Sequence, residues 1–142
     1  MIFKLSENRP KAAGVMLIAK DTNRILVAER SEKVNHPLLY NLFGGGIEKG
    51  ERPLAAALRE LKEESGFSES INLKQIHIGR MPNLTYYTFY GYVDKEFEPQ
   101  LNFESKSAKW ISLESLKSLK SKTYFLENLL EEKYDEINEL VN

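Results

Sequence analysis

Cysteine is absent from this sequence of 142 residues, and neither sign of charge is in clear excess. The absence of cysteine excludes disulfide-stapled scaffolds, thiolate zinc sites and cysteine nucleophiles. With 20 Lys and Arg against 21 Asp and Glu, the chain lacks the basic excess of proteins that bind nucleic acid in general. Its longest apolar run, residues 12–19, is far shorter than the roughly 20 residues of a membrane helix, and the N-terminus lacks a signal-peptide pattern. These absences favour a cytoplasmic protein without a membrane partner.

The residues that are present suffice for one folded domain. The composition, 42% hydrophobic and 29% charged, is close to the average for globular proteins. Because no repeat, linker or low-complexity segment divides the chain, we expect residues 1–142 to form a single domain.

Apolar periodicity predicts a mixture of strands and helices. The predicted strands cover residues 12–19, 25–28, 73–80, 85–93 and 109–111. Helices are predicted over residues 54–64 and 123–141, and the glycine-rich stretch 38–50 is predicted to be a loop. This order of elements indicates a mixed α/β or α+β domain.

Three glutamates, Glu60, Glu63 and Glu64, lie on one face of the helix predicted over residues 54–64. At about 100° per residue, this acidic face borders the apolar stripe of the helix. Like charges one turn apart, and carboxylates in the last helical turn, together cost about 1–2 kcal/mol. A bound cation would relieve this cost. Carboxylate ligands, without a nearby histidine or thiolate, favour Mg²⁺, with Mn²⁺ as a substitute.

A solvated helix face without function is the alternative interpretation of these glutamates, because acidic clusters on exposed helices are common. The loop before the helix favours the metal site instead. Gly44, Gly45 and Gly46 carry no Cβ, so that their backbone can approach an anion or a metal closely, and Glu48 and Glu51 add carboxylates. The segment therefore indicates a phosphate site built around a metal ion.

The spacing of these residues resembles the Nudix box. From Gly45, five residues lead to Glu51, and seven more lead to Arg59-Glu60-Leu61-Lys62-Glu63-Glu64-Ser65-Gly66-Phe67. Every fixed position of the Nudix signature is matched. The resemblance implies a fold of class α/β, a Nudix-type α/β/α sandwich around a mixed β-sheet. It also implies hydrolysis of a nucleoside diphosphate linked to another moiety, with divalent cations as cofactors.

The resemblance also implies roles for individual residues. The implied catalytic residues are Glu63, Glu64 and Arg59. The implied metal ligands are Glu60, Glu63, Glu64, the carbonyl of Gly44, and Glu104, which lies six residues before Trp110. The general base is Glu63 or Glu64, with Glu104 as the rival. The predicted substrate-binding residues are Arg30, Gly45, Gly46 and Tyr86, the last because one face of an aromatic strand could stack a base.

We therefore expect a metal-dependent pyrophosphohydrolase acting on a small nucleotide by attack of water on phosphorus. A nucleoside triphosphate and a nucleotide sugar such as ADP-ribose are both open as substrates. Two alternatives remain: a nucleotide-sensing module of the same fold without catalysis, and an enzyme that removes pyrophosphate from RNA 5′ ends. The amphipathic C-terminal helix packs on the sheet or contributes to a homodimer.

Overall fold

The computed structural model describes residues 10–142. In chain order the elements are β1 (Lys11–Ala19), β2 (Ile25–Arg30), β3 (Tyr40–Asn41), β4 (Phe43–Gly46), α2 (Pro53–Ser65), β5 (Lys74–Met81), β6 (Leu84–Val93), β7 (Ser105–Ile111), α3 (Leu113–Ser118) and α4 (Tyr124–Val141).

Strand β1 lies at the centre of a mixed sheet with the strand order β3-β2-β1-β6-β5. It pairs in parallel with β6 along its whole length, from Lys11 opposite Thr85 to Ala19 opposite Val93. It pairs antiparallel with β2 and with β4, while β7 pairs with β2. All residues of β1 after Lys11 are buried, as expected for a strand that is covered on both faces.

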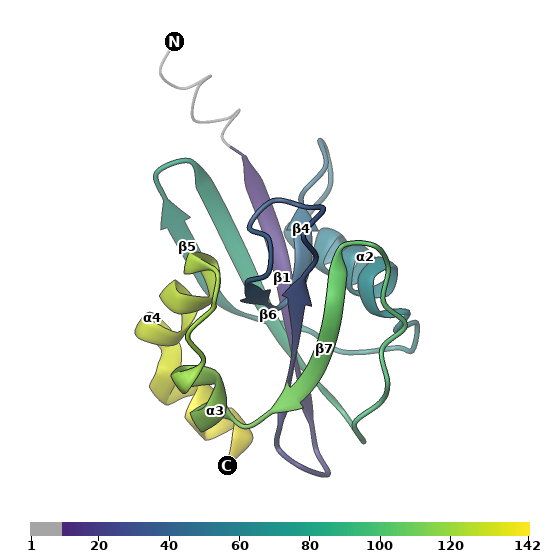
Figure 1. Ribbon diagram of the computed structural model, residues 1–142, viewed down its shortest axis with the longest axis vertical. Helices are drawn as coiled ribbons and strands as arrows, with labels where there is room; N and C mark the ends of the chain where they lie inside the picture. The colour runs from purple at the N-terminus through teal and green to yellow at the C-terminus, as the bar shows by residue number, and fades with distance from the viewer. Residues whose placement is uncertain (1–9) are drawn as a thin grey trace.

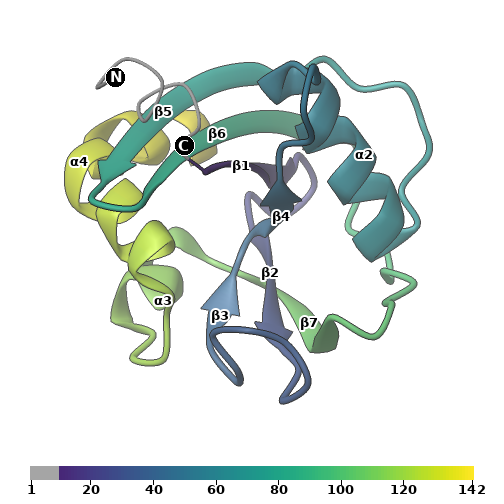
Figure 2. The ribbon, with the colours of Figure 1, turned by 90° about the horizontal axis from the view of Figure 1, so that it is seen from above.

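Helices cover both faces of the sheet, with α2 on one side and α3 and α4 on the other (Figures 1 and 2). The alternation of side chains along β1 divides the core between these layers. Val15 and Leu17 pack in the cluster that contains Leu61 of α2, whereas Met16 and Ile18 pack in the cluster that contains the leucines of α4. The predicted α/β/α sandwich around a mixed sheet is confirmed.

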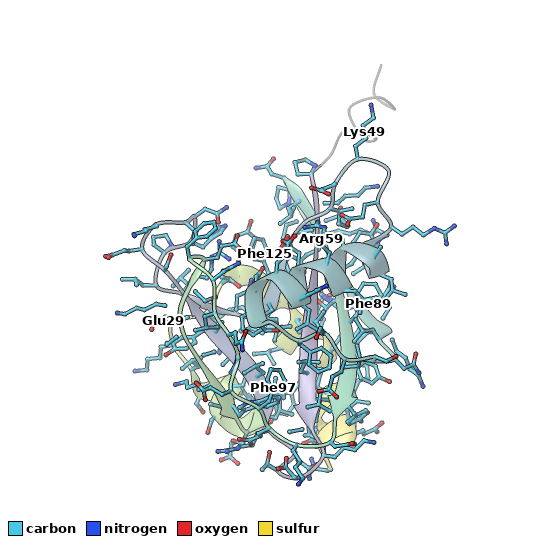
Figure 3. The ribbon with its side chains drawn as sticks, turned by 90° about the vertical axis from the view of Figure 1, so that its right-hand side faces the viewer. Glu29, Lys49, Arg59, Phe89, Phe97 and Phe125 are labelled. Atoms are coloured by element: carbon cyan, nitrogen blue, oxygen red, sulfur yellow. The ribbon has the colours of Figure 1, made fainter. Side chains whose placement is uncertain are left out.

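Helix α2 lies across the sheet when it is viewed from its own side (Figure 3). The predicted bounds are nearly those observed, because the sequence carries both terminal signals. Pro53 occupies the first helical position, and Gly66 ends the helix in the left-handed conformation with φ 75°, which glycine adopts without steric cost. The strands predicted over residues 12–19 and 25–28 and the helix predicted over residues 123–141 are likewise present.

The prediction that residues 38–50 form a loop is wrong for part of this stretch, because β3 and β4 lie within it. Gly44, Gly45 and Gly46 pair with β1 opposite Gly14, Ala13 and Ala12. None of these three glycines has a positive φ. A Cβ on Gly44 would stand 2.6 Å from the Cα of Gly14, so glycine here permits a close approach of strands rather than a turn.

Within residues 10–142, no helix combines the length and the apolar character that crossing a membrane requires.

Candidate active site

The three glutamates of α2 do not share one environment. Glu60 and Glu64 are buried, with exposed fractions of 8% and 4%, whereas Glu63 is exposed. The difference follows from helix geometry, because Glu60 and Glu64 are one turn apart on the side next to the buried Leu61, and Glu63 faces outward. The acidic face that the sequence predicts is therefore split between a buried pair and an exposed carboxylate.

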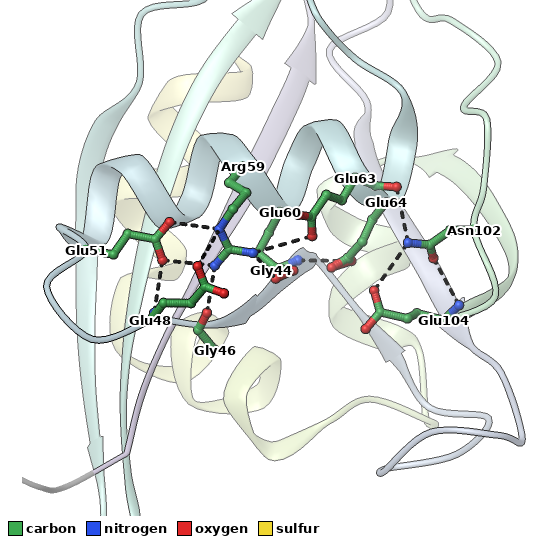
Figure 4. Close-up of polar contacts among 10 residues, drawn as sticks. All are labelled: Gly44, Gly46, Glu48, Glu51, Arg59, Glu60, Glu63, Glu64, Asn102 and Glu104. Carbon is green, nitrogen blue, oxygen red and sulfur yellow. Dashed lines mark hydrogen bonds and ion pairs between the residues drawn. The ribbon is translucent and has the colours of Figure 1, made fainter.

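Strand β4 lies directly against the buried pair, Glu60 and Glu64 (Figure 4). The backbone N–H of Gly44 donates to Glu64 Oε1 at 3.2 Å. A Cβ on Gly45 would lie 2.5 Å from Glu60 Oε2, well inside van der Waals contact. The glycines therefore allow both carboxylates to lie against the backbone of β4.

Arg59 holds the surrounding carboxylates in place (Figure 4). Its guanidinium donates two hydrogen bonds, of 2.8 and 2.9 Å, to the Glu51 carboxylate. It also donates to Glu60 Oε1 at 3.0 Å and to the carbonyl of Gly46 at 3.0 Å. Glu63 Oε2 lies 3.4 Å from the same guanidinium. The planar guanidinium group suits bidentate binding of a carboxylate. Its hydrogen bonds lower the pKa of Glu51 to about 2.

Glu104 joins the buried pair from the loop that precedes β7. One carboxylate oxygen from each of Glu60, Glu64 and Glu104 lies within 4.8 Å of the other two. The structure therefore brings together three of the predicted metal ligands, from segments about 40 residues apart in sequence. Glu63 lies outside this group.

Asn102 positions Glu104 and was not predicted from the sequence. Its Nδ2 donates to the Glu63 carbonyl at 3.1 Å and to Glu104 Oε2 at 3.3 Å. Its Oδ1 accepts the backbone N–H of Glu104 at 2.9 Å. Asn102 therefore ties the loop carboxylate to the last turn of α2 (Figure 4). An asparagine two residues before an acid in a loop carries no sequence signal for this role.

The electrostatics of the triad favour a hard cation. Burial, together with the neighbouring Glu60 and Glu104 carboxylates, raises the pKa of Glu64 to about 9. Its Oε2 is buried and has no hydrogen-bond partner among residues 10–142. An unpaired buried carboxylate oxygen beside two more carboxylates is costly without a counter-charge. Oxygen ligands of this kind fit Mg²⁺ or Mn²⁺.

A cavity of about 500 Å³ extends from this centre and is lined by all the predicted substrate-binding residues. Glu104 lines the same cavity. The guanidinium of Arg30 is engaged by Asn35, whose backbone carbonyl accepts from its Nε at 2.8 Å. Tyr86 is only 5% exposed, and burial and the nearby Glu64 raise the pKa of its phenol, so the hydroxyl stays protonated.

The chain is similar to known proteins in sequence and in fold. The NUDIX domain matches residues 8–132 of the chain. An RNA pyrophosphohydrolase from Agrobacterium fabrum is 41% identical over 58 residues, which are 38% of this chain and 34% of that protein. Nucleoside triphosphatase NudI from Escherichia coli is 29% identical over 113 residues, which are 70% of this chain and 80% of that protein.

Among solved structures, the Nudix hydrolase RenU from M. smegmatis matches with a TM-score of 0.78. The match covers 94% of this chain and 88% of that chain at 18% identity, and it shows a shared fold. The chain spans about a third of the length of several curated relatives it matches, between 28% and 34%.

Proposed function

This chain belongs to the NUDIX family of hydrolases, which cleave pyrophosphate bonds, and from that premise we propose that it is a Mg²⁺-dependent pyrophosphohydrolase of small nucleotides. The observation that carries the proposal is the triad of Glu60, Glu64 and Glu104, in which Glu60 and Glu64 are buried and Glu104 half-buried. Within residues 10–142, the Oε2 of Glu64 has no hydrogen-bond partner. Those three side chains, with the carbonyl of Gly44 as the predicted additional ligand, would hold the cation.

A divalent cation bound there would neutralise negative charge on the diphosphate and lower the pKa of the attacking water. The chain's own residues provide the rest. Arg59 fixes Glu51 and Glu60 by direct hydrogen bonds, which keeps the carboxylates from moving apart. The glycines of β4 present backbone at the cavity wall, where no side chain blocks a phosphate. Arg30 adds positive charge to the same wall.

A carboxylate accepts the proton of the attacking water, and Glu63, Glu64 and Glu104 are the candidates. Glu63 is exposed and outside the triad, so a role as base leaves the three carboxylates of the triad free to bind the cation. Glu64 and Glu104 are members of the triad, so a role as base would be shared with metal binding. Substitution distinguishes these two cases. Replacing Glu63 would leave the Mg²⁺ concentration required for activity unchanged, whereas replacing Glu64 or Glu104 would raise it.

The test is a phosphate-release screen with and without Mg²⁺ over nucleoside triphosphates, ADP-ribose, other nucleotide sugars and dinucleoside polyphosphates. We expect Glu60→Gln and Glu64→Gln to lose activity and to require more Mg²⁺. If Glu63 is the base, Glu63→Gln lowers kcat by about 10²- to 10⁴-fold without changing the Mg²⁺ requirement. Glu69→Gln, an exposed carboxylate outside the triad, is the matched control. Hydrolysis that persists with EDTA would contradict the proposal.

Removal of pyrophosphate from RNA 5′ ends is the second candidate function. It is favoured by the similarity to an enzyme named RNA pyrophosphohydrolase, at 41% identity over 58 residues, and Lys11 and Arg30 line the same cavity. RNA bearing a 5′-triphosphate therefore belongs in the screen. A higher kcat/KM for this RNA than for every free nucleotide would replace small nucleotides as the substrate class.

A nucleotide sensor without catalysis is the remaining alternative. It requires that the chain bind a nucleotide and release no phosphate from any compound in the panel with Mg²⁺ or Mn²⁺. A homodimer is a separate prediction, which light scattering on the eluting protein measures directly.

A further inference from the structure

The cavity beside the carboxylate triad has a second wall made of aromatic side chains. Its lining continues from Gly44 and Glu104 to His36, Tyr86, Tyr124 and Phe125. Tyr124 and Phe125 come from the first turn of α4, and His36 comes from the loop between β2 and β3. The cavity therefore joins a place for phosphates to a place for a flat, apolar group.

The aromatic rings form a continuous packed group. Phe125 stacks on Tyr86 with ring centroids 5.0 Å apart and planes inclined by 17°. Tyr124 lies 4.4 Å from Phe125, and His36 meets Phe125 edge-on at 5.2 Å. Tyr86 is buried and Phe125 half-buried, whereas Tyr124 is 49% exposed. Tyr124 is therefore the member of the group with the most free ring surface.

The loop that carries His36 is held in a constrained shape. His36 and Leu38 have φ values of 50° and 61°, which side chains other than glycine adopt at a cost. The Leu38 N–H donates to the Arg30 carbonyl at 2.9 Å, and the Arg30 side chain donates to the backbone carbonyl and to the Oδ1 of Asn35. Hydrogen bonds on both sides of His36 thus hold the shape of this loop, and strained segments of this kind cluster at ligand sites.

We propose that Tyr124 determines base specificity: the heterocyclic base of the substrate stacks on its ring, beside His36, while the phosphates lie at the glycine strand. The proposal rests on the proposed function and adds the base-binding residue to it. Every nucleobase presents a flat face to an aromatic ring, so the larger purines bind more tightly than pyrimidines on this surface. Tyr86, the predicted stacking residue, is covered by Phe125 and supports that ring.

The experiment is isothermal titration of the wild type, Tyr124→Ala and Tyr124→Phe with two probes in Mg²⁺. One probe is α,β-methylene ATP, which carries a base and resists cleavage between the α and β phosphates. The other is inorganic tripolyphosphate, which lacks a base. We expect Tyr124→Ala to weaken binding of the nucleotide by about 5- to 100-fold and binding of tripolyphosphate by less than about twofold. Tyr124→Phe keeps the ring and retains nucleotide affinity.

The matched control is Phe103→Ala. Phe103 is 71% exposed and lines a different hollow, beside Leu38 and Lys106, so its removal leaves nucleotide binding unchanged. The proposal is overturned if Tyr124→Ala weakens the binding of both probes equally. It is also overturned if only Phe103→Ala weakens nucleotide binding, or if the wild type binds no nucleotide. If the wild type binds the nucleotide through Tyr124 and hydrolyses nothing, the proposed function fails and the base site stands.

Discussion

Replacing Glu64 by glutamine is expected to stabilise the metal-free protein while abolishing its response to Mg²⁺. The side chain is 4% exposed, and burial beside Glu60 and Glu104 raises its pKa to about 9. In the unfolded chain the same carboxyl ionises near its ordinary pKa of 4.5. Folding without a cation therefore requires Glu64 to take up a proton at neutral pH, and glutamine removes that requirement.

The magnitude follows from proton linkage. Keeping the carboxyl protonated at pH 7, about 2.5 pH units above its ordinary pKa, costs about 3 kcal/mol. This cost depends on pH and on the unfolded-state pKa, and it changes little for any folded-state pKa above about 8. Glutamine can still accept the Gly44 N–H bond. For a chain of this length, 1 kcal/mol corresponds to about 3 °C in Tm, so we expect a gain of about 7–10 °C.

The assay is thermal unfolding of the wild type and Glu64→Gln in EDTA from pH 5 to pH 8, repeated with Mg²⁺. The folded-state pKa lies above the unfolded value, so the contribution of Glu64 to stability is largest at low pH and falls as pH rises toward 9. The wild type should lose about 1.4 kcal/mol per pH unit relative to the variant. Mg²⁺ should raise the Tm of the wild type and leave that of the variant nearly unchanged.

Glu63→Gln is the control, because Glu63 is exposed and its replacement should change stability by less than about 0.5 kcal/mol. The reasoning predicts that Glu64 is protonated in the folded protein when no cation is bound. It is refuted if Glu64→Gln is no more stable than the wild type in EDTA, or if the difference in stability between them does not grow with pH.

Three further predictions concern the framework of the site. Arg59→Lys should lower kcat by about 10- to 100-fold, because an ammonium cannot replace the guanidinium fork that holds the carboxylates; steady-state kinetics with unchanged circular dichroism would show it, and full activity would contradict it. Gly45→Ala should weaken the Mg²⁺ response in thermal shift, since the new Cβ would stand 2.5 Å from Glu60 Oε2. In the same assay Gly46→Ala, whose Cβ meets no atom within 4 Å, should show the Mg²⁺ response of the wild type. Leu61→Ala should reduce the free energy of unfolding in urea by about 2–5 kcal/mol, because Leu61 is 1% exposed in the core under α2; a loss below about 1 kcal/mol would show that the core beneath the site is loosely packed.

Helix α2 shows how far the sequence alone could lead. Its start at Pro53, its end at Gly66 and its apolar stripe are local properties, because proline restricts φ and glycine tolerates the left-handed conformation in any context. The spacing of the glutamates and Arg59 on the helix surface follows from 3.6 residues per turn. These features led directly to the family resemblance and to the prediction of a cation site.

Strand β4 shows where local reasoning fails. Three consecutive glycines indicate a flexible loop when they are considered alone. Pairing with β1 gives them regular extended structure. A Cβ on Gly44 would stand 2.6 Å from the Cα of Gly14 in β1, and a Cβ on Gly45 would stand 2.5 Å from Glu60 Oε2. The sequence contains these two glycines but does not show the strand and the helix that exclude a side chain at each.

The composition of the active centre was decided by tertiary structure. Helical spacing places Glu60, Glu63 and Glu64 together, yet packing against β4 buries two of them and leaves Glu63 in solvent. Sheet pairing of β7 with β2 brings Glu104 into reach from a distant segment. Through helix geometry, the sequence determined which carboxylates of α2 could bind a cation. Which of them are buried and unpaired depends on long-range packing, because burial and charge repulsion arise only when separate segments meet.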